Sequence, residues 1–321
     1  MTSPVTVYRH TDDGAPQLDN TMTGFYNVLR KCLVEGYGDK EPLGWTIPFE
    51  DTDAYKMVIH APKGNSGFGG YCQLAPYSAG SNTSPSVMLI PDTYMSGVDE
   101  YTNPQKKRTI PINYSLCNGW VIIGTDRGFY WQRLYTDQVN HKIQWQYCGA
   151  LFVGDIDSNY QADVGCFTAL YSASTADDTS ASAGEGVNNI KDTYYAGFLM
   201  DTDGAGTATG IVVKESGTAY QYVAESLLIT PDTEPLTFVF REIEVGFVGT
   251  NLYDRNGVSV MFSDLKPYHR GVIAGMLTAN ITMCGDVAYP YITNINGSDY
   301  FPLCMTSGAA VWINIESWYN E

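Results

Sequence analysis

Two runs of sequence decide the fold: Trp120-Val-Ile-Ile-Gly124 and Gly128-Phe-Tyr-Trp-Gln-Arg-Leu134. The first run is apolar throughout, which is typical of a strand in the interior of a sheet with both faces covered. A turn signal, Asp126-Arg127-Gly128, joins the two runs, so they predict an antiparallel hairpin. We expect this hairpin to anchor the first hydrophobic core.

The rest of the chain repeats this pattern of short apolar runs separated by turn residues. The 321 residues include 32 Gly, 24 Tyr and 12 Phe, a composition that favours strands and tight turns over long helices. The fold class predicted is mainly β, with antiparallel sheets in a sandwich or barrel-like arrangement. The candidate strands are 54–60, 70–75, 86–90, 119–124, 128–134, 144–153, 165–171, 194–200, 209–214, 219–224, 236–240, 259–262, 278–283 and 309–316.

One amphipathic helix is predicted near the N-terminus, from Met22 to Glu35. Its apolar residues recur at spacings of three and four, which places them on a single face. Asp19 or Asn20 can cap the start of this helix. Gly36 and Gly38 can end it, because glycine accepts left-handed dihedral angles.

Composition along the chain predicts four segments. Residues 1–18 are polar and contain proline, as expected for an extended N-terminal arm that lies on a neighbouring subunit. Residues 19–171 hold the helix and a β domain. Residues 172–187 are small and polar, which is typical of a flexible loop or linker. Residues 188–321 form a second β region, either separate or packed into the same domain.

The charge and cysteine content narrow the range of partners. A net charge of −17 repels phosphate backbones and anionic lipids, so we expect no direct contact with nucleic acid or membrane. No apolar run approaches a membrane span, and the first residues lack the pattern of a signal peptide. The seven cysteines are scattered and form no CxxC motif, so free thiols in apolar surroundings are expected.

Catalytic and metal-binding motifs are missing from the sequence. The four histidines are His10, His60, His141 and His269, and no two of them have a metal-binding spacing. There is no GxSxG elbow and no phosphate-binding loop, and the glycine-rich run 64–70 is interpreted as a hairpin loop. We therefore assign no catalytic, cofactor-binding or metal-binding residue, and expect no cofactor and no enzymatic activity.

Two groups of carboxylates are candidate calcium ligands: Asp155-Ile-Asp157-Ser-Asn159 and Asp201-Thr-Asp203-Gly204. Neither is followed by the distal glutamate of a calcium loop, and turn formation is the favoured interpretation. A glycosidase needs two carboxylates in an aromatic cleft, and the sequence alone cannot pair them. Trp131 and Trp145, with nearby tyrosines, are candidates for stacking on sugars.

Five blocks of the sequence form a recognisable set: residues 29–49 (from Leu29-Arg-Lys-Cys to Trp45-Thr-Ile-Pro-Phe49), Trp120-Val-Ile-Ile-Gly-Thr-Asp-Arg-Gly-Phe-Tyr130, Phe152-Val-Gly-Asp155-Ile with Asp163, Arg270-Gly-Val-Ile-Ala-Gly275 and Trp312-Ile-Asn-Ile-Glu-Ser-Trp318. Together these blocks resemble a family of virion structural proteins of tailed bacteriophages. They are distributed over most of the chain. The resemblance brings no enzymatic residues with it.

The resemblance implies a structural protein of the virion, made in the host cytoplasm, that assembles as a symmetric oligomer. The expected location is the neck, collar, tail or baseplate. The alternatives are a capsid decoration protein, a tip protein that binds a receptor or carbohydrate and, with less support, a virion-associated glycan hydrolase. The expected partners are other copies of the chain and neighbouring virion proteins, with a host-surface glycan as a further candidate.

Overall fold

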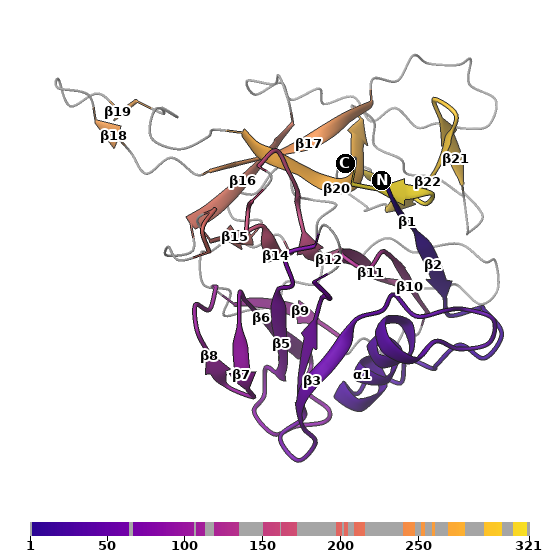
Figure 1. Cartoon of the computed structure of the whole chain (residues 1–321). Helices are drawn as coiled ribbons and strands as arrows, with labels where there is room; N and C mark the ends of the chain where they lie inside the picture. Colours follow the sequence, from indigo (N-terminus) through magenta and orange to yellow (C-terminus); the bar gives the residue numbers. More distant parts are fainter. Residues whose placement is uncertain are drawn as a thin grey trace.

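The protein is mainly β, with several antiparallel sheets and one helix near the N-terminus, which confirms the predicted fold class (Figure 1). The computed structural model describes residues 2–63, 67–105, 107–112, 119–134, 150–160, 162–171, 197–200, 202–204, 209–215, 240–247, 252–253, 259–260, 269–279, 292–303 and 311–319. No helix in these ranges is long and apolar enough to cross a membrane.

Three larger sheets make up the fold, and we name them lower, middle and upper after their places in Figure 1. The lower sheet has the order β3 (Thr46–Asp51), β4 (Lys56–His60), β5 (Tyr71–Pro76), β6 (Ser86–Asp92), β9 (Arg108–Pro111). The middle sheet has the order β14 (Phe167–Leu170), β12 (Ala150–Asp155), β11 (Gly128–Leu134), β10 (Gly119–Gly124), β2 (Thr6–Arg9).

The upper sheet is formed mostly by the C-terminal half of the chain. Its order is β15 (Gly197–Leu199), β16 (Thr209–Glu215), β17 (Phe240–Phe247), β20 (His269–Ala279), β23 (Val311–Asn314), β22 (Ser298–Leu303), β21 (Thr293–Ile295), and β13 (Asp157–Ser158) also pairs with β20. Three small ribbons complete the described strands: β1 (Ser3–Pro4) with β24 (Ser317–Trp318), β7 (Met95–Gly97) with β8 (Glu100–Tyr101), and β18 (Leu252–Tyr253) with β19 (Ser259–Val260).

The middle sheet separates two hydrophobic cores and is buried on both faces. Successive side chains of a strand point to opposite faces. Trp120 and Ile122 of β10 therefore lie in the first core, with the helix and the lower sheet, whereas Val121 and Ile123 lie in the second core. This arrangement explains why the run 120–124 is apolar without alternation. The second core contains residues from both sides of the expected connection at 172–187.

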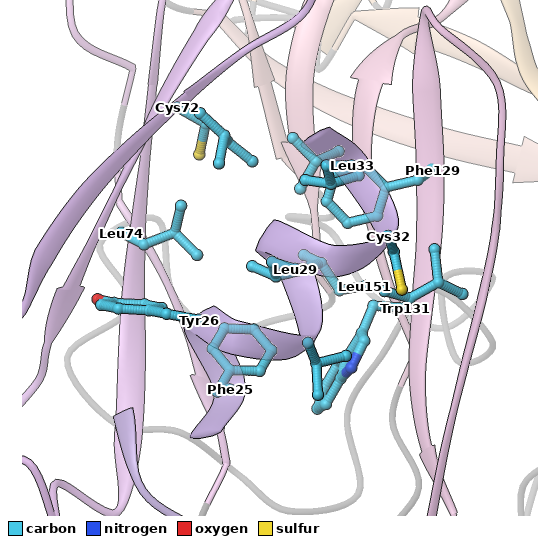
Figure 2. Packing of buried hydrophobic residues seen from close by; sticks show 14 of the residues in the cluster. Phe25, Tyr26, Leu29, Cys32, Leu33, Cys72, Leu74, Phe129, Trp131 and Leu151 are labelled. Atoms are coloured by element: carbon cyan, nitrogen blue, oxygen red, sulfur yellow. The ribbon is translucent and has the colours of Figure 1, made fainter. Parts of the chain in front are cut away.

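Helix α1 (Met22–Arg30) continues into a π-helical turn (Lys31–Glu35) and fills the space between the lower and middle sheets. In Figure 2 its Phe25 and Leu29 point towards Trp131 and Leu151 of the middle sheet, and the Phe25 and Trp131 rings meet edge to face at 5.1 Å. The length and buried face agree with the prediction, and Gly36 ends the helix with a φ of 78°.

The residue that caps α1 differs from the two predicted candidates. Thr21 is the cap, and its Oγ1 accepts a hydrogen bond of 3.0 Å from the Gly24 N–H. Asp19 instead accepts hydrogen bonds from the N–H and the hydroxyl of Thr21. Asp19 thus orients the capping residue without capping the helix itself.

The segment 1–18 differs from the expectation of an arm that lies on a neighbour. Its strand β2 pairs with β10 along four residues and so becomes an edge of the chain's own middle sheet. Tyr8 is fully buried in the first core, and Trp120 Nε1 donates to the Pro16 carbonyl at 3.0 Å. The polar composition of the segment gave no sign of this role, because β2 contributes only Tyr8 to the first core and Val7 to the second.

The strand predictions were most accurate where the strands are most buried. The predicted hairpin is present with the bounds expected for β10 and β11, in register from Gly119 opposite Leu134 to Gly124 opposite Phe129. Several strands were not predicted, among them β2, β3, β9 and β22, and β17 and β20 share only one or two residues with their candidates. The candidate 219–224 and the expected linker 172–187 lie outside the described residues.

Candidate functional site

Asp155 and Arg127 form a buried polar centre where the middle sheet meets the end of the upper sheet. Arg127 lies in the turn between β10 and β11, and its Nε is 3.5 Å from Asp155 Oδ2. The same oxygen accepts a hydrogen bond of 3.2 Å from the Phe68 N–H. The backbones are also joined, because the Asp155 N–H donates to the Arg127 carbonyl at 3.0 Å.

Two glycines allow this close approach of β11 and β12. Gly128 and Gly154 are directly opposite each other, and a Cβ on Gly154 would lie 2.3 Å from the Gly128 Cα. Gly154 also has a φ of 150°, a conformation that side chains resist. Larger residues at these positions would separate the strands and move Asp155 away from Arg127.

Tyr319 covers this centre from the other end of the sequence. Its hydroxyl donates to the Asp155 carbonyl at 2.8 Å, and the Arg127 guanidinium carbon lies 3.9 Å from the centre of its ring. A cation over an aromatic ring is attracted by the ring's negative face. Burial raises the pKa of the Tyr319 hydroxyl, so it remains a donor at ordinary pH.

The protein environment favours the neutral form of the Asp155 carboxyl more than water does. Burial raises the pKa of this carboxyl to about 6, although the Arg127 charge and the Phe68 N–H pull it down. The carboxyl is fully buried, and its Oδ1 accepts no hydrogen bond from the described residues. Desolvation therefore outweighs an ion pair that is 3.5 Å long.

A second buried pair, Asp163 with Arg270, joins the turn before β14 to strand β20. Arg270 Nε donates to Asp163 Oδ2 at 2.6 Å and its Nη2 to the other carboxylate oxygen, so the pair is bidentate. Ser158 adds a hydrogen bond of 2.7 Å to Asp163, and Arg270 Nη1 donates to the Met200 carbonyl at 2.5 Å. Both side chains are completely buried.

These two centres join sheets and leave the carboxylates out of reach of a substrate. A glycan hydrolase needs two carboxylates that face the sugar. Asp155 and Asp163 are both buried, and each is neighboured by its own arginine. Among the described residues no group of three or more His, Cys, Asp or Glu side chains is arranged to hold a metal ion.

The two carboxylate groups that the sequence offers as candidate calcium ligands lie in different kinds of secondary structure. Asp155 and Asp157 lie in strands β12 and β13 instead of a single turn, so their backbones pair with neighbouring strands. Asp203 and Gly204 lie in a turn, where Gly204 has a φ of 72°. Asp201 is outside the described residues.

Three cysteines and His10 are structural in their contacts. Cys32, Cys72 and Cys166 are free and buried, as predicted. His10 Nδ1 lies 3.1 Å from the Trp120 carbonyl, and burial lowers its pKa. His60 is half-buried and belongs to the aromatic group described next.

Three aromatic residues lie close together where β4 ends and β5 begins, and we name them the aromatic surface: His60, Tyr71 and Tyr94. The His60 and Tyr71 rings stack at 4.2 Å on neighbouring strands, and the Tyr94 ring meets Tyr71 edge to face at 5.7 Å. Tyr94 is 55% exposed. Burial lowers the pKa of His60, and burial followed by the neighbouring Tyr94 raises the pKa of Tyr71.

This surface extends past β6 towards the turn that precedes β14. A Cβ on Gly204 would contact both Thr93, the neighbour of Tyr94, and Val164. Val164 is 43% exposed. Thr93 and Val164, which come from separate segments, therefore both lie beside Gly204.

The aromatic residues that the structure offers for sugar stacking are not the tryptophans that the sequence analysis proposed. Trp131 is buried against Phe25 in the first core, so its assignment as a sugar-stacking residue is wrong. Trp145 lies outside the described residues. Tyr71 lies on the face of β5 opposite Cys72 and Leu74, but no local pattern marks it, because Gln73 on the same face is buried.

Comparison with known proteins adds no identification. No protein-family model matches the chain, and no curated protein matches it. The class defined by the fold is a mainly β protein whose middle sheet is shared by two cores.

Proposed function

We propose that this chain is a non-enzymatic structural protein of a tailed-bacteriophage virion that assembles as a symmetric oligomer in the neck, collar, tail or baseplate. The observation that carries the proposal is where the five blocks of the resemblance lie in the fold. Blocks that are far apart in the sequence contact one another in the interior. The residues that make these contacts stabilise the fold and do not line an open cleft.

The contacts among these blocks are specific. Trp45 Nε1 donates to the Thr125 carbonyl at 3.2 Å, which joins the first block to the second. The Tyr130 hydroxyl donates to the Ala274 carbonyl at 2.6 Å, which joins the second to the fourth. The blocks that resemble the virion family are thus the parts that hold the three sheets together.

Further contacts join the remaining blocks. The Asp163–Arg270 pair connects the third block to the fourth. Trp318 of the fifth block meets the Tyr130 ring edge to face at 5.2 Å. In a subunit that acts by assembly, we expect the blocks shared with its family to form the interior. The outer surface then binds the neighbouring subunits.

Quantitative mass spectrometry of purified particles of the phage that encodes the chain tests the proposal. We expect the chain in every preparation at a small copy number relative to the major capsid protein, as for a neck, collar, tail or baseplate subunit. A copy number close to that of the capsid protein would favour the alternative of capsid decoration. Absence from the particles would contradict a structural role and bring back the hydrolase alternative.

The aromatic surface favours a second candidate function, a tip protein that binds a receptor or carbohydrate. Exposed aromatic rings stack on the apolar faces of sugars and also serve as anchors between proteins. The exposure of Tyr94 fits either use.

The substitution Tyr94→Ala separates these two uses of the aromatic surface. If the surface is an assembly contact, as we expect, incorporation of the variant into particles will fall at least tenfold. Normal incorporation with slower adsorption of the particles to host cells would favour receptor binding instead. Tyr77→Ala, at an exposed tyrosine beyond the other end of β5, is the matched control and should leave both measurements unchanged.

A further inference from the structure

The segment Ser317–Tyr319, which we name the latch, brings three parts of the fold together. Its strand β24 pairs with β1 near the N-terminus, so the two ends of the described chain lie close together (Figure 1). Trp318 packs over Gly275 of β20, where a Cβ would lie 2.1 Å from the indole nitrogen. Tyr319 has a φ of 59° and turns its side chain into the Asp155 centre.

The latch is held by few backbone contacts and by two aromatic side chains. The ladder between β1 and β24 has only two residue pairs. Trp318 and Tyr319 are each only 2% exposed, so opening of the latch would expose both rings. Because Tyr319 covers Asp155, opening would also bring water to that carboxyl.

We propose that the latch is a proton-sensitive element, which the neutral Asp155 carboxyl holds closed and the ionised carboxylate loosens. The reason is the burial of the Asp155 carboxyl in the closed state. Asp155 Oδ1 is buried and accepts no hydrogen bond from the described residues, and the Arg127 contact to Oδ2 is 3.5 Å long. A charge on this carboxyl is therefore poorly compensated until water reaches it.

The groups that face Asp155 come from every element packed against it. Arg127 from the β10–β11 turn favours the ionised form, and the Phe68 N–H does the same from the loop before β5. Cys166 and Tyr319 are neutral, since burial raises the pKa of both, and the Cys166 thiol also lowers the pKa of Asp155. Asp163 acts on Cys166 and is paired with Arg270.

The direction of the pH effect follows from the two pKa values of Asp155. The pKa is about 6 when the latch is closed and returns towards its ordinary value of 3.8 when water enters. Between these values the closed state binds a proton that the open state releases, so opening becomes more favourable as the pH rises from 4 to 6.5. Two pKa units correspond to a change of up to about a hundredfold in the opening equilibrium.

Hydrogen exchange of the full chain, followed by mass spectrometry between pH 4.5 and 7, tests this inference. After correction for the intrinsic exchange rates, we expect the protection of residues 317–319 to fall by roughly tenfold or more as the pH rises. In Asp155→Asn this dependence on pH should disappear. The matched control is Asp299→Asn, a surface carboxylate on β22 beside the same segment, which should keep the dependence of the unaltered chain.

Two results would overturn the inference. One is protection of residues 317–319 in the unaltered chain that stays constant over this range, a measurement that does not depend on whether any variant folds. The other is a dependence on pH that persists in Asp155→Asn. The variant Tyr319→Phe adds a third check, because loss of its hydrogen bond to Asp155 should lower protection at every pH while the dependence remains.

Discussion

Replacing Arg270 by Met will lower the free energy of unfolding by about 3–5 kcal/mol, because it leaves the Asp163 carboxylate charged and buried without its cation. Both side chains are fully buried, and Arg270 also donates to the Met200 carbonyl. The loss should be measured by chemical denaturation at pH 7.

A surface pair provides the control for this experiment. Arg30 and Glu50 also form an ion pair, at 2.7 Å, but their side chains are 31% exposed. Arg30→Met should therefore change the free energy of unfolding by less than about 1 kcal/mol. Equal losses in the two variants would show that the buried pair is not what joins β20 to the turn before β14.

Replacing Trp120 by Ala will lower the free energy of unfolding by about 3–5 kcal/mol, the usual cost of emptying a large aromatic site in a core. Trp120 is fully buried, its indole N–H donates to the Pro16 carbonyl, and its ring meets Tyr37 edge to face. Chemical denaturation followed by circular dichroism measures the loss.

The control variant for Trp120 is Phe, which keeps an aromatic ring and loses the hydrogen bond to Pro16. Its loss should be clearly smaller than that of Ala, because most of the buried surface is retained. An unchanged midpoint in Trp120→Ala would mean that β10 is not at the centre of the first core.

The proposed role in a virion rests on the resemblance of five blocks of the sequence to a family of structural proteins of tailed bacteriophages. The structure adds that these blocks pack on one another through Trp45, Tyr130 and Arg270. The polar groups of these contacts are satisfied inside the fold. The role in the particle is a proposal whose first test is the copy number in the virion.

Local sequence patterns were sufficient to predict the elements that are stabilised by their own neighbours. The hairpin of β10 and β11 and helix α1 were predicted because the spacing of their apolar residues can be recognised within a short stretch of sequence. The capping residue was missed because Asp19, Asn20 and Thr21 are all suitable caps, and the choice among them depends on backbone geometry.

Tertiary structure alone decided what these elements pack against and which polar residues meet. Arg270 binds a carboxylate 107 residues away, and the Tyr319 hydroxyl reaches a carbonyl 164 residues away. Segment 1–18 is polar in composition, but β2 completes the middle sheet and contributes a residue to each core. The sequence by itself determined where helix α1 and the hairpin of β10 and β11 form, because those depend on local spacing and dihedral angles. Only the fold decided that one sheet serves two cores and that Asp155 lies under Tyr319, because such contacts depend on chain paths that no local pattern encodes.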